Sequence, residues 1–363
     1  MDDCSSANWR AYIRYESGAV VLDLNGKGLS SVPAAVTELI EVEEIRLRKN
    51  NLSALPTSIN KLENLQMLDV AGNNLTHLPA ETGDLKELRL LKAGFNQLVS
   101  VPSSIQKLDK LEKLYLGNNR LKELPVEVCD LKELRVLSVS NNQLVGLPQI
   151  ALNKLEALNL DNNRLTELPT SVGDLKELRV LKVRNNKLVG LSSSIQQLSK
   201  LSWLYLDKNS LTELPSEIGH LKELRVLHVT YNCLVGLPTS VLKLNKLEEL
   251  YLGANKLREI PAEIGNLKEL RLLDISNNEL VHLPTSMKKL GYLEKLYLGY
   301  NKLTALPTEI GDLTNLKEMY VRGNPFTVDA VRYVLKLQKK GMHTDISGEK
   351  KPKGMVTNII ARS

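Results

Sequence analysis

The chain has 363 residues, of which 42% are hydrophobic and 25% are charged, a composition typical of a folded protein. The 48 Lys and Arg residues exceed the 42 Asp and Glu residues by only six, so the composition lacks the basic bias of a nucleic-acid-binding protein and we expect no nucleic-acid partner. The three cysteines, Cys4, Cys129 and Cys233, are too sparse for a disulfide framework or a zinc site.

Residues 1–19 are predicted to form an N-terminal cap helix. Ser5 and Ser6 are suitable N-cap residues, and Trp9, Tyr12 and Ile13 would share one apolar face. The polar start of the chain does not resemble a signal peptide, and no apolar run has the length of a membrane span. We therefore expect a cytoplasmic protein that does not span a membrane.

Residues 20–326 are predicted to form a repeat array. About 14 copies of the pattern LxxLxxLxLxxNxLxxLPxxIxx follow one another in steps of 23 residues, with one step of 21 between Asn142 and Asn163. The alternating L-x-L segment predicts a short strand, the proline ends it, and the IxxLxxL segment predicts a short helical or 3-10 turn. The expected fold is an α/β solenoid, a curved horseshoe with a parallel sheet on its concave face.

One asparagine anchors each repeat after the first, degenerate copy. Its amide can both donate and accept hydrogen bonds, and a buried polar side chain has to be paired. We interpret these residues as a structural ladder between successive coils, not as catalytic groups, because catalysis does not need 13 identical side chains. They are Asn50, Asn73, Asn96, Asn119, Asn142, Asn163, Asn186, Asn209, Asn232, Asn255, Asn278, Asn301 and Asn324.

The variable positions of the predicted strands carry aromatic residues. These positions face the concave side, where exposed aromatic residues are typical anchors of a protein interface. The candidate partner-binding residues are Tyr115, Trp203, Tyr205, His228, Tyr231, Tyr251, Tyr297, Tyr300 and Tyr320. The alternative is that Leu-Tyr-Leu units duplicated in pairs of repeats and that their tyrosines stack only on each other, since Tyr205, Tyr251 and Tyr297 are 46 residues apart.

Charge follows the same double period. Seven residues before each asparagine, basic and acidic residues alternate along the array, with one interruption at Ser202. We interpret this series as a solvated salt ladder in which opposite charges on adjacent strands attract, and the alternative is a stripe that steers a partner. The series is Arg89, Glu112, Arg135, Glu156, Arg179, Ser202, Arg225, Glu248, Arg271, Glu294 and Lys317.

A C-terminal cap and a tail are predicted after Asn324. Thr327 would cap a helix over residues 327–341, with Val328, Val331, Val334 and Leu335 as its apolar residues and Gly341 at its end. Residues 342–363 are basic and are expected to form a flexible tail, either a solvated terminus or a contact for an acidic partner or membrane surface.

The repeat unit, for example Leu214-Pro215-Ser216-Glu217-Ile218-Gly219-His220-Leu221, resembles intracellular leucine-rich repeats. It is most similar to the Ras-pathway scaffold class, with Scribble, Erbin and plant Ras-group-related proteins as members. The resemblance extends over residues 20–326 and implies a non-catalytic scaffold in signalling. Its implied partners are a small GTPase or a phosphatase subunit.

The sequence contains none of the common catalytic or nucleotide-binding motifs, so we expect neither an enzyme nor a cofactor. The expected function is a monomeric scaffold or adaptor that binds a protein on its concave face. Two alternatives remain open: a ligand-recognition receptor of the innate-immune type, and one part of a larger multidomain signalling protein.

Overall fold

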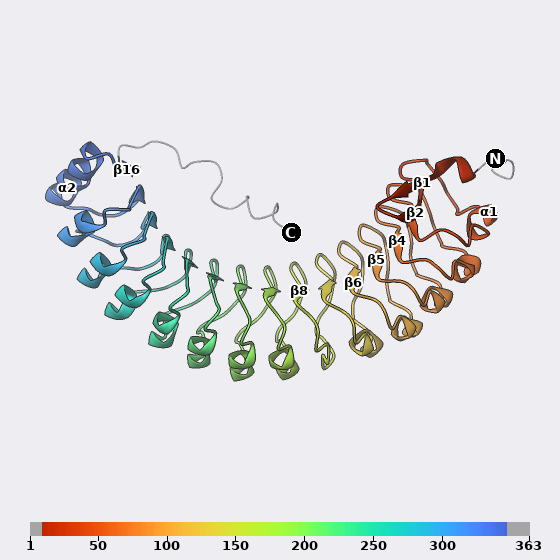
Figure 1. Cartoon of the computed structure of the whole chain (residues 1–363). Coiled ribbons are helices and arrows are strands. Elements are labelled where there is room, and N and C mark those ends of the chain that lie inside the picture. Colours follow the sequence, from red (N-terminus) through yellow and green to blue (C-terminus); the bar gives the residue numbers. More distant parts are fainter. Residues whose placement is uncertain (1–8, 347–363) are drawn as a thin grey trace. The chain divides into compact units, whose positions relative to one another are not determined.

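The computed structural model describes residues 9–346, and the chain divides into two compact units between Asn209 and Ser210. In each unit, short strands, most of them three residues long, follow one another in chain order, and short 3-10 helices lie on the opposite side (Figure 1). The architecture is a leucine-rich-repeat solenoid of about 13–14 repeats, which confirms the predicted fold. We call the surface of each unit that its strands present to solvent the strand face.

The first unit has ten strands and eight short helices within the described residues. They are η2 (Trp9–Tyr12), β1 (Ile13–Glu16), β2 (Ala19–Asp23), α1 (Ala34–Thr37), β3 (Glu44–Arg46), η3 (Thr57–Lys61), β4 (Met67–Asp69), η4 (Ala80–Asp84), β5 (Leu90–Lys92), η5 (Ser103–Lys107), β6 (Lys113–Tyr115), η6 (Val126–Asp130), β7 (Val136–Ser138), β8 (Ala157–Asn159), η7 (Thr170–Asp174), β9 (Val180–Lys182), η8 (Ser193–Gln197) and β10 (Trp203–Tyr205).

The second unit has six strands and six helices within the described residues. They are η9 (Ser216–His220), β11 (Val226–His228), η10 (Thr239–Lys243), β12 (Glu249–Tyr251), η11 (Ala262–Asn266), β13 (Leu272–Asp274), η12 (Thr285–Lys289), β14 (Lys295–Tyr297), η13 (Thr308–Asp312), β15 (Glu318–Tyr320), α2 (Val328–Lys339) and β16 (His343–Thr344).

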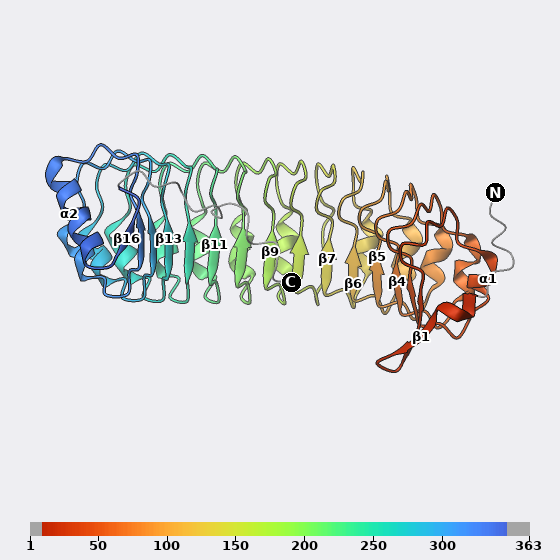
Figure 2. The ribbon, with the colours of Figure 1, turned by 90° about the horizontal axis from the view of Figure 1, so that it is seen from above.

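Parallel pairing places equivalent residues of neighbouring repeats side by side (Figure 2). Leu68 pairs with Leu91, and Leu91 pairs with Leu114, each the fully buried middle residue of its strand. The strand residues on either side of each such leucine point to the strand face. The register therefore turns every position of the repeat into a column of side chains about 4.8 Å apart.

Proline starts most of the outer 3-10 helices. Pro125, for example, precedes η6 with φ −65° and ψ 147°, and the φ angle is the one that its ring imposes. Val128 then donates its backbone N–H to the Pro125 carbonyl oxygen at 3.1 Å and buries its side chain. The proline thus ends the extended segment and begins the outer turn without leaving an unpaired N–H group.

The 21-residue repeat is shortened on this outer side, as its sequence indicates. Within residues 9–346, β7 leads to β8 with no helix between them. Ile150 donates its backbone N–H to the Ser171 hydroxyl of the next repeat at 2.8 Å. One side chain thus satisfies a backbone group in the segment where the helical turn is missing.

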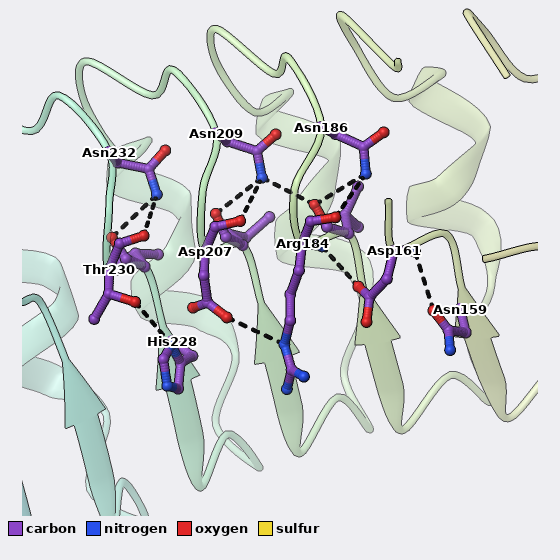
Figure 3. Close-up of polar contacts among 12 residues, drawn as sticks. Asn159, Asp161, Arg184, Asn186, Asp207, Asn209, His228, Thr230 and Asn232 are labelled. Atoms are coloured by element: carbon purple, nitrogen blue, oxygen red, sulfur yellow. Dashed lines mark hydrogen bonds and ion pairs between the residues drawn. The ribbon is translucent and has the colours of Figure 1, made fainter. Parts of the chain in front are cut away.

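The asparagine amides connect neighbouring repeats in both units. Asn73 is buried, and its Oδ1 accepts the Leu52 N–H at 3.0 Å while its Nδ2 donates to the Leu47 and Val70 carbonyl oxygens at 2.9 Å. Asn186 and Asn209 make the same type of bonds (Figure 3). Equivalent amide bonds are made by Asn50, Asn96, Asn119, Asn142, Asn163, Asn232, Asn255, Asn278, Asn301 and Asn324.

The N-terminal cap differs from the predicted helix over residues 1–19. Trp9–Tyr12 form a single 3-10 turn, and β1 then pairs antiparallel with β2, from Ile13 opposite Leu22 to Glu16 opposite Ala19. Ser17 and Gly18 both have positive φ angles, 51° and 88°, as a tight two-residue hairpin requires. The hairpin covers the edge of β2 that would otherwise be open. Ser5 and Ser6 lie outside the described residues.

The C-terminal cap contains the expected helix and an additional strand. Thr327 caps α2 by accepting the Ala330 N–H, but the buried residues of α2 are Ala330, Val334 and Leu337, whereas Val328 and Leu335 are exposed. The predicted flexible tail, residues 342–363, begins instead with β16, which pairs with β15. Residues 347–363 lie outside the described residues.

A carboxylate fixes this last strand. The buried Asp345 accepts the N–H groups of Val321 and Arg322 at 2.6 and 3.1 Å. In the array, N–H groups of this kind bond to the next repeat. Here the Asp345 carboxylate accepts them instead.

The asparagine ladder can be tested with two adjacent residues. Asn73→Ala leaves buried backbone groups unpaired and should lower the free energy of unfolding by about 2–4 kcal/mol. Asn74→Ala removes an exposed amide and should change it by less than about 0.5 kcal/mol. Urea denaturation followed by circular dichroism measures both. Equal midpoints for the two variants would contradict the structural role of Asn73.

Candidate protein-binding surface

Side chains from three positions of each repeat line the strand face. The first and third strand residues lie on it, as Glu249 and Tyr251 do in β12, and the residue just before the ladder asparagine lies at the end of the following turn. All nine candidate partner-binding residues, eight aromatic residues and His228, occupy such positions. Their exposure to solvent divides them into two groups.

The first group is packed within the strand face. Tyr205, Tyr297 and Tyr320 are buried, which corrects the expectation that they present open rings to solvent. Tyr115, His228 and Tyr251 are half-buried. The physical reason is the register, because it places side chains of adjacent repeats close enough to cover each ring, whether by another ring or by a side chain such as Arg184 over Tyr205.

In the second unit this packing forms a column that we call the stacked row: His228, Tyr251, Asp274, Tyr297 and Tyr320, the third residues of β11 to β15. The rings of His228 and Tyr251 stack at a centroid distance of 4.1 Å, and those of Tyr297 and Tyr320 stack at 4.9 Å. His343 of β16 meets Tyr320 edge-on at 5.8 Å. The stacked row is therefore a preorganised part of the strand face that extends across the unit.

Hydrogen bonds hold the tyrosine hydroxyl groups of the stacked row. Tyr251 donates its hydroxyl to Glu249 Oε2 at 2.9 Å, and Tyr320 donates to Glu318 Oε2 at 3.3 Å. Burial, followed by the nearby carboxylates, raises the pKa of Tyr251 and of Tyr297 well above the usual range, and raises the pKa of Tyr320 to about 12. These hydroxyls thus stay protonated further into the alkaline range than an ordinary tyrosine does.

The second group consists of aromatic residues that are open to solvent. Tyr231 and Tyr300, which we call the rim tyrosines, are 52% and 43% exposed. Both immediately precede a ladder asparagine and have left-handed φ angles of 54° and 56°. Ala254 occupies the same position in another repeat of the unit with φ 54°, so this conformation does not require a large side chain. The rim tyrosines are three repeats apart, or about 14 Å along the strand face.

The first unit has one open aromatic residue among those predicted, Trp203, which is 37% exposed. Beside it, Tyr205 lies beneath the Arg184 guanidinium, whose carbon is 4.0 Å from the ring centroid. Asp207 pairs with Arg184 Nε at 3.1 Å, and Asp161 accepts the Arg184 backbone N–H at 2.7 Å (Figure 3). Burial raises the pKa of Asp161. These charged groups compensate one another within β8 to β10 and the turns that follow.

Sequence reasoning identified the positions but missed this division into packed and open side chains. The available signal was the recurrence of rings in one column of adjacent strands, which indicates mutual packing. Each rim tyrosine has a small residue on one side of its column, Ala254 beside Tyr231 and Gly323 beside Tyr300.

No group of three or more His, Cys, Asp or Glu residues within residues 9–346 is arranged to hold a metal ion. No helix in the same range is long and apolar enough to cross a bilayer. Cys129 and Cys233 are free thiols, and burial raises the pKa of Cys129 to about 11.

Comparison with protein-family models matches residues 19–143 and 250–339 to a leucine-rich repeat region, and residues 153–211 to a leucine rich repeat. The chain belongs to the leucine-rich-repeat family. Proteins of this family are generally non-catalytic modules that bind proteins or peptides. A search of curated proteins found no match to this chain.

Solved leucine-rich-repeat structures are similar over most of the chain. A leucine-rich-repeat protein of Leptospira interrogans is 33% identical, with a TM-score of 0.75 over 89% of this chain and 95% of that one. The plant peptide hormone receptor RGFR1, solved in complex with RGF2, is 26% identical, with a TM-score of 0.66 over 88% of this chain and 65% of that one. An internalin of Listeria monocytogenes, 22% identical with a TM-score of 0.72, shares the fold over 86% of this chain and 89% of that one.

The pKa of Tyr320 predicts a loss of stability in alkali. Tyrosine ionises near pH 10 in an unfolded chain, so between about pH 10 and 12 the unfolded state has released a proton that the folded state retains. The stabilisation is complete below pH 10 and is lost as the pH rises through 12. Tyr320→Phe should make the decline of unfolding free energy over this range less steep.

Urea denaturation at a series of pH values measures this slope, and the difference in tyrosinate absorbance between wild type and Tyr320→Phe locates the ionisation. A difference signal centred near pH 10 would show that Tyr320 is not held in the stacked row as described.

Proposed function

We propose that the chain is a non-catalytic scaffold or adaptor that binds a protein partner on the strand face of its second unit. The observation that carries the proposal is the pair of open rim tyrosines, Tyr231 and Tyr300, beside the stacked row, whose tyrosine rings are packed. Large rings with about half of their surface in solvent are suited to contact another molecule.

The stacked row supports the rim tyrosines by giving the face a fixed shape. A partner that binds a preorganised surface loses less free energy to ordering than one that binds mobile side chains. Tyrosine adds a large contact area with few rotatable bonds and a polar tip. The nearby Glu249, Lys295 and Glu318 have mixed charge, which suits a folded partner with mixed surface charge.

For the setting, we infer an intracellular, cytoplasmic monomer in signal transduction. The similarity of its LPxxIxxL units to Ras-pathway scaffold repeats supports this inference and makes a small GTPase or a phosphatase subunit the first partner to test. The free thiols of Cys129 and Cys233 are compatible with a reducing compartment.

A ligand-recognition receptor module is the second candidate. The similarity to RGFR1, solved in complex with RGF2, favours a peptide as the bound molecule. The cellular compartment of the protein distinguishes the scaffold from the receptor module. Subcellular fractionation should recover the native protein with cytosolic markers, and recovery from the extracellular fraction with Asn51 or Asn74 glycosylated would favour the receptor.

The binding surface is tested by Tyr231→Ala combined with Tyr300→Ala. Because Ala254 already has the same backbone conformation, the fold should be retained, while affinity for the partner should fall at least about tenfold. Tyr292→Ala is the matched control, since Tyr292 is a 52% exposed tyrosine outside the strands.

Partners are identified by proximity labelling in the native cell, and the purified pair is then measured by isothermal titration calorimetry. Unchanged affinity in the double variant, or an equal loss in Tyr292→Ala, would contradict binding through the rim tyrosines.

A further inference from the structure

The salt ladder joins basic residues of one repeat to glutamates of a neighbouring repeat, and Glu294 pairs with both Arg271 and Lys317. In four places an arginine just before one strand contacts a glutamate just before the next strand, and the distances are 2.8 Å for Arg89–Glu112, 2.6 Å for Arg135–Glu156 and 3.2 Å for Arg271–Glu294. Arg225 and Glu248 form the fourth pair. The regular pattern makes any departure from it visible.

One arginine departs from the pattern. Ser202 stands where the four other pairs have a glutamate, and no ion pair holds the Arg179 guanidinium within residues 9–346. The stacking of these coils is normal, because Glu177 and Lys200 of the same two repeats form their ion pair at 2.6 Å, as Glu133 and Lys154 do in the preceding pair of repeats. Only the carboxylate opposite Arg179 is missing.

The next residue also departs from the pattern. Trp203 follows Ser202, whereas lysine, alanine or glutamate follows the ladder glutamate at residues 113, 157, 249 and 295. Arg179 and Trp203 are immediate neighbours, because the Arg179 carbonyl oxygen accepts the N–H groups of Ser202 at 2.9 Å and Trp203 at 3.0 Å. An exposed cation and a 37% exposed indole thus extend from adjoining backbone positions, where the other paired repeats have a closed ion pair.

The charge along β9 and β10 favours an anionic ligand. Arg184 is compensated by Asp207 and Asp161. Lys182 has no salt bridge within residues 9–346 and, as the third residue of β9, lies on the strand face. An acidic group is therefore complementary to this corner of the strand face, and an apolar side chain is complementary to the indole.

We propose that Arg179, Ser202 and Trp203 form a docking site for an acidic peptide segment of a partner protein. A glutamate or aspartate of that segment pairs with Arg179 in place of the missing ladder carboxylate, and an adjacent large apolar side chain packs on Trp203. This site lies in the first unit and stands independently of the rim tyrosines.

Ser202→Glu is the decisive variant. It restores the residue found at 112, 156, 248 and 294, so it should preserve the fold, pair with Arg179 and occupy the site from within. Arg179→Gln and Trp203→Ala remove the two contacts. Arg135→Gln is the matched control, because Arg135 already has an intramolecular partner in Glu156.

The probe is a displayed library of random twelve-residue peptides, selected on the full chain with Ser202→Glu as the counter-selection target. The expected peptides combine Asp or Glu with a neighbouring large apolar residue. The dissociation constant of the best one should rise at least about tenfold in Ser202→Glu, Arg179→Gln and Trp203→Ala, and less than about twofold in Arg135→Gln. Binding is measured by fluorescence anisotropy, with circular dichroism confirming that each variant is folded.

The proposal is overturned if no acidic peptide is enriched on wild type over Ser202→Glu. It is equally overturned if replacing the peptide's acidic residue by its amide leaves affinity unchanged, or if Arg135→Gln weakens binding as much as Arg179→Gln does.

Discussion

The fold depends on one recurring interaction, the bridge that a buried asparagine amide makes between adjacent repeats. Each repeat leaves backbone N–H and C=O groups unpaired where the chain turns out of its strand, and Asn73 and its equivalents satisfy groups of both their own repeat and the one before. Because the same amide recurs from repeat to repeat within each unit, it fixes the register of the strands as well as their spacing. The positions of all strand-face side chains follow from that register.

The strict register has a second effect: it brings residues at equivalent positions of neighbouring repeats into contact. Where the residues at one position are aromatic, as at Tyr297 and Tyr320, their rings pack and become part of the scaffold. Where they are opposite charges, as at Arg135 and Glu156, they pair. Surface that remains for recognition is found where a column changes residue type, at Tyr231, Tyr300 and Trp203. The capacity to bind therefore arises from irregularity within a regular array.

The sequence alone predicts the repeat length, the strand positions and the proline-started outer turns, because these depend on short-range spacing of leucine, asparagine and proline. It fails where the outcome depends on what lies alongside. The N-terminal segment has apolar residues that suit a helix, yet the open edge of β2 and the Ser17-Gly18 turn favour a hairpin. Exposure of Tyr205 was likewise mispredicted, since the Arg184 guanidinium that covers it comes from the preceding repeat.

The alternation of basic and acidic residues along the salt ladder constrains how an array of this kind can change in length. Removing a single coil between Arg89 and Glu156 would bring Arg next to Arg or Glu next to Glu across the new junction, whereas removing two would restore an attractive neighbour. Growth and loss of coils should therefore proceed in even steps of 46 residues. Deletion of an odd number of coils would be tolerated best next to Ser202. This is the one position of the series that has no charged residue to pair.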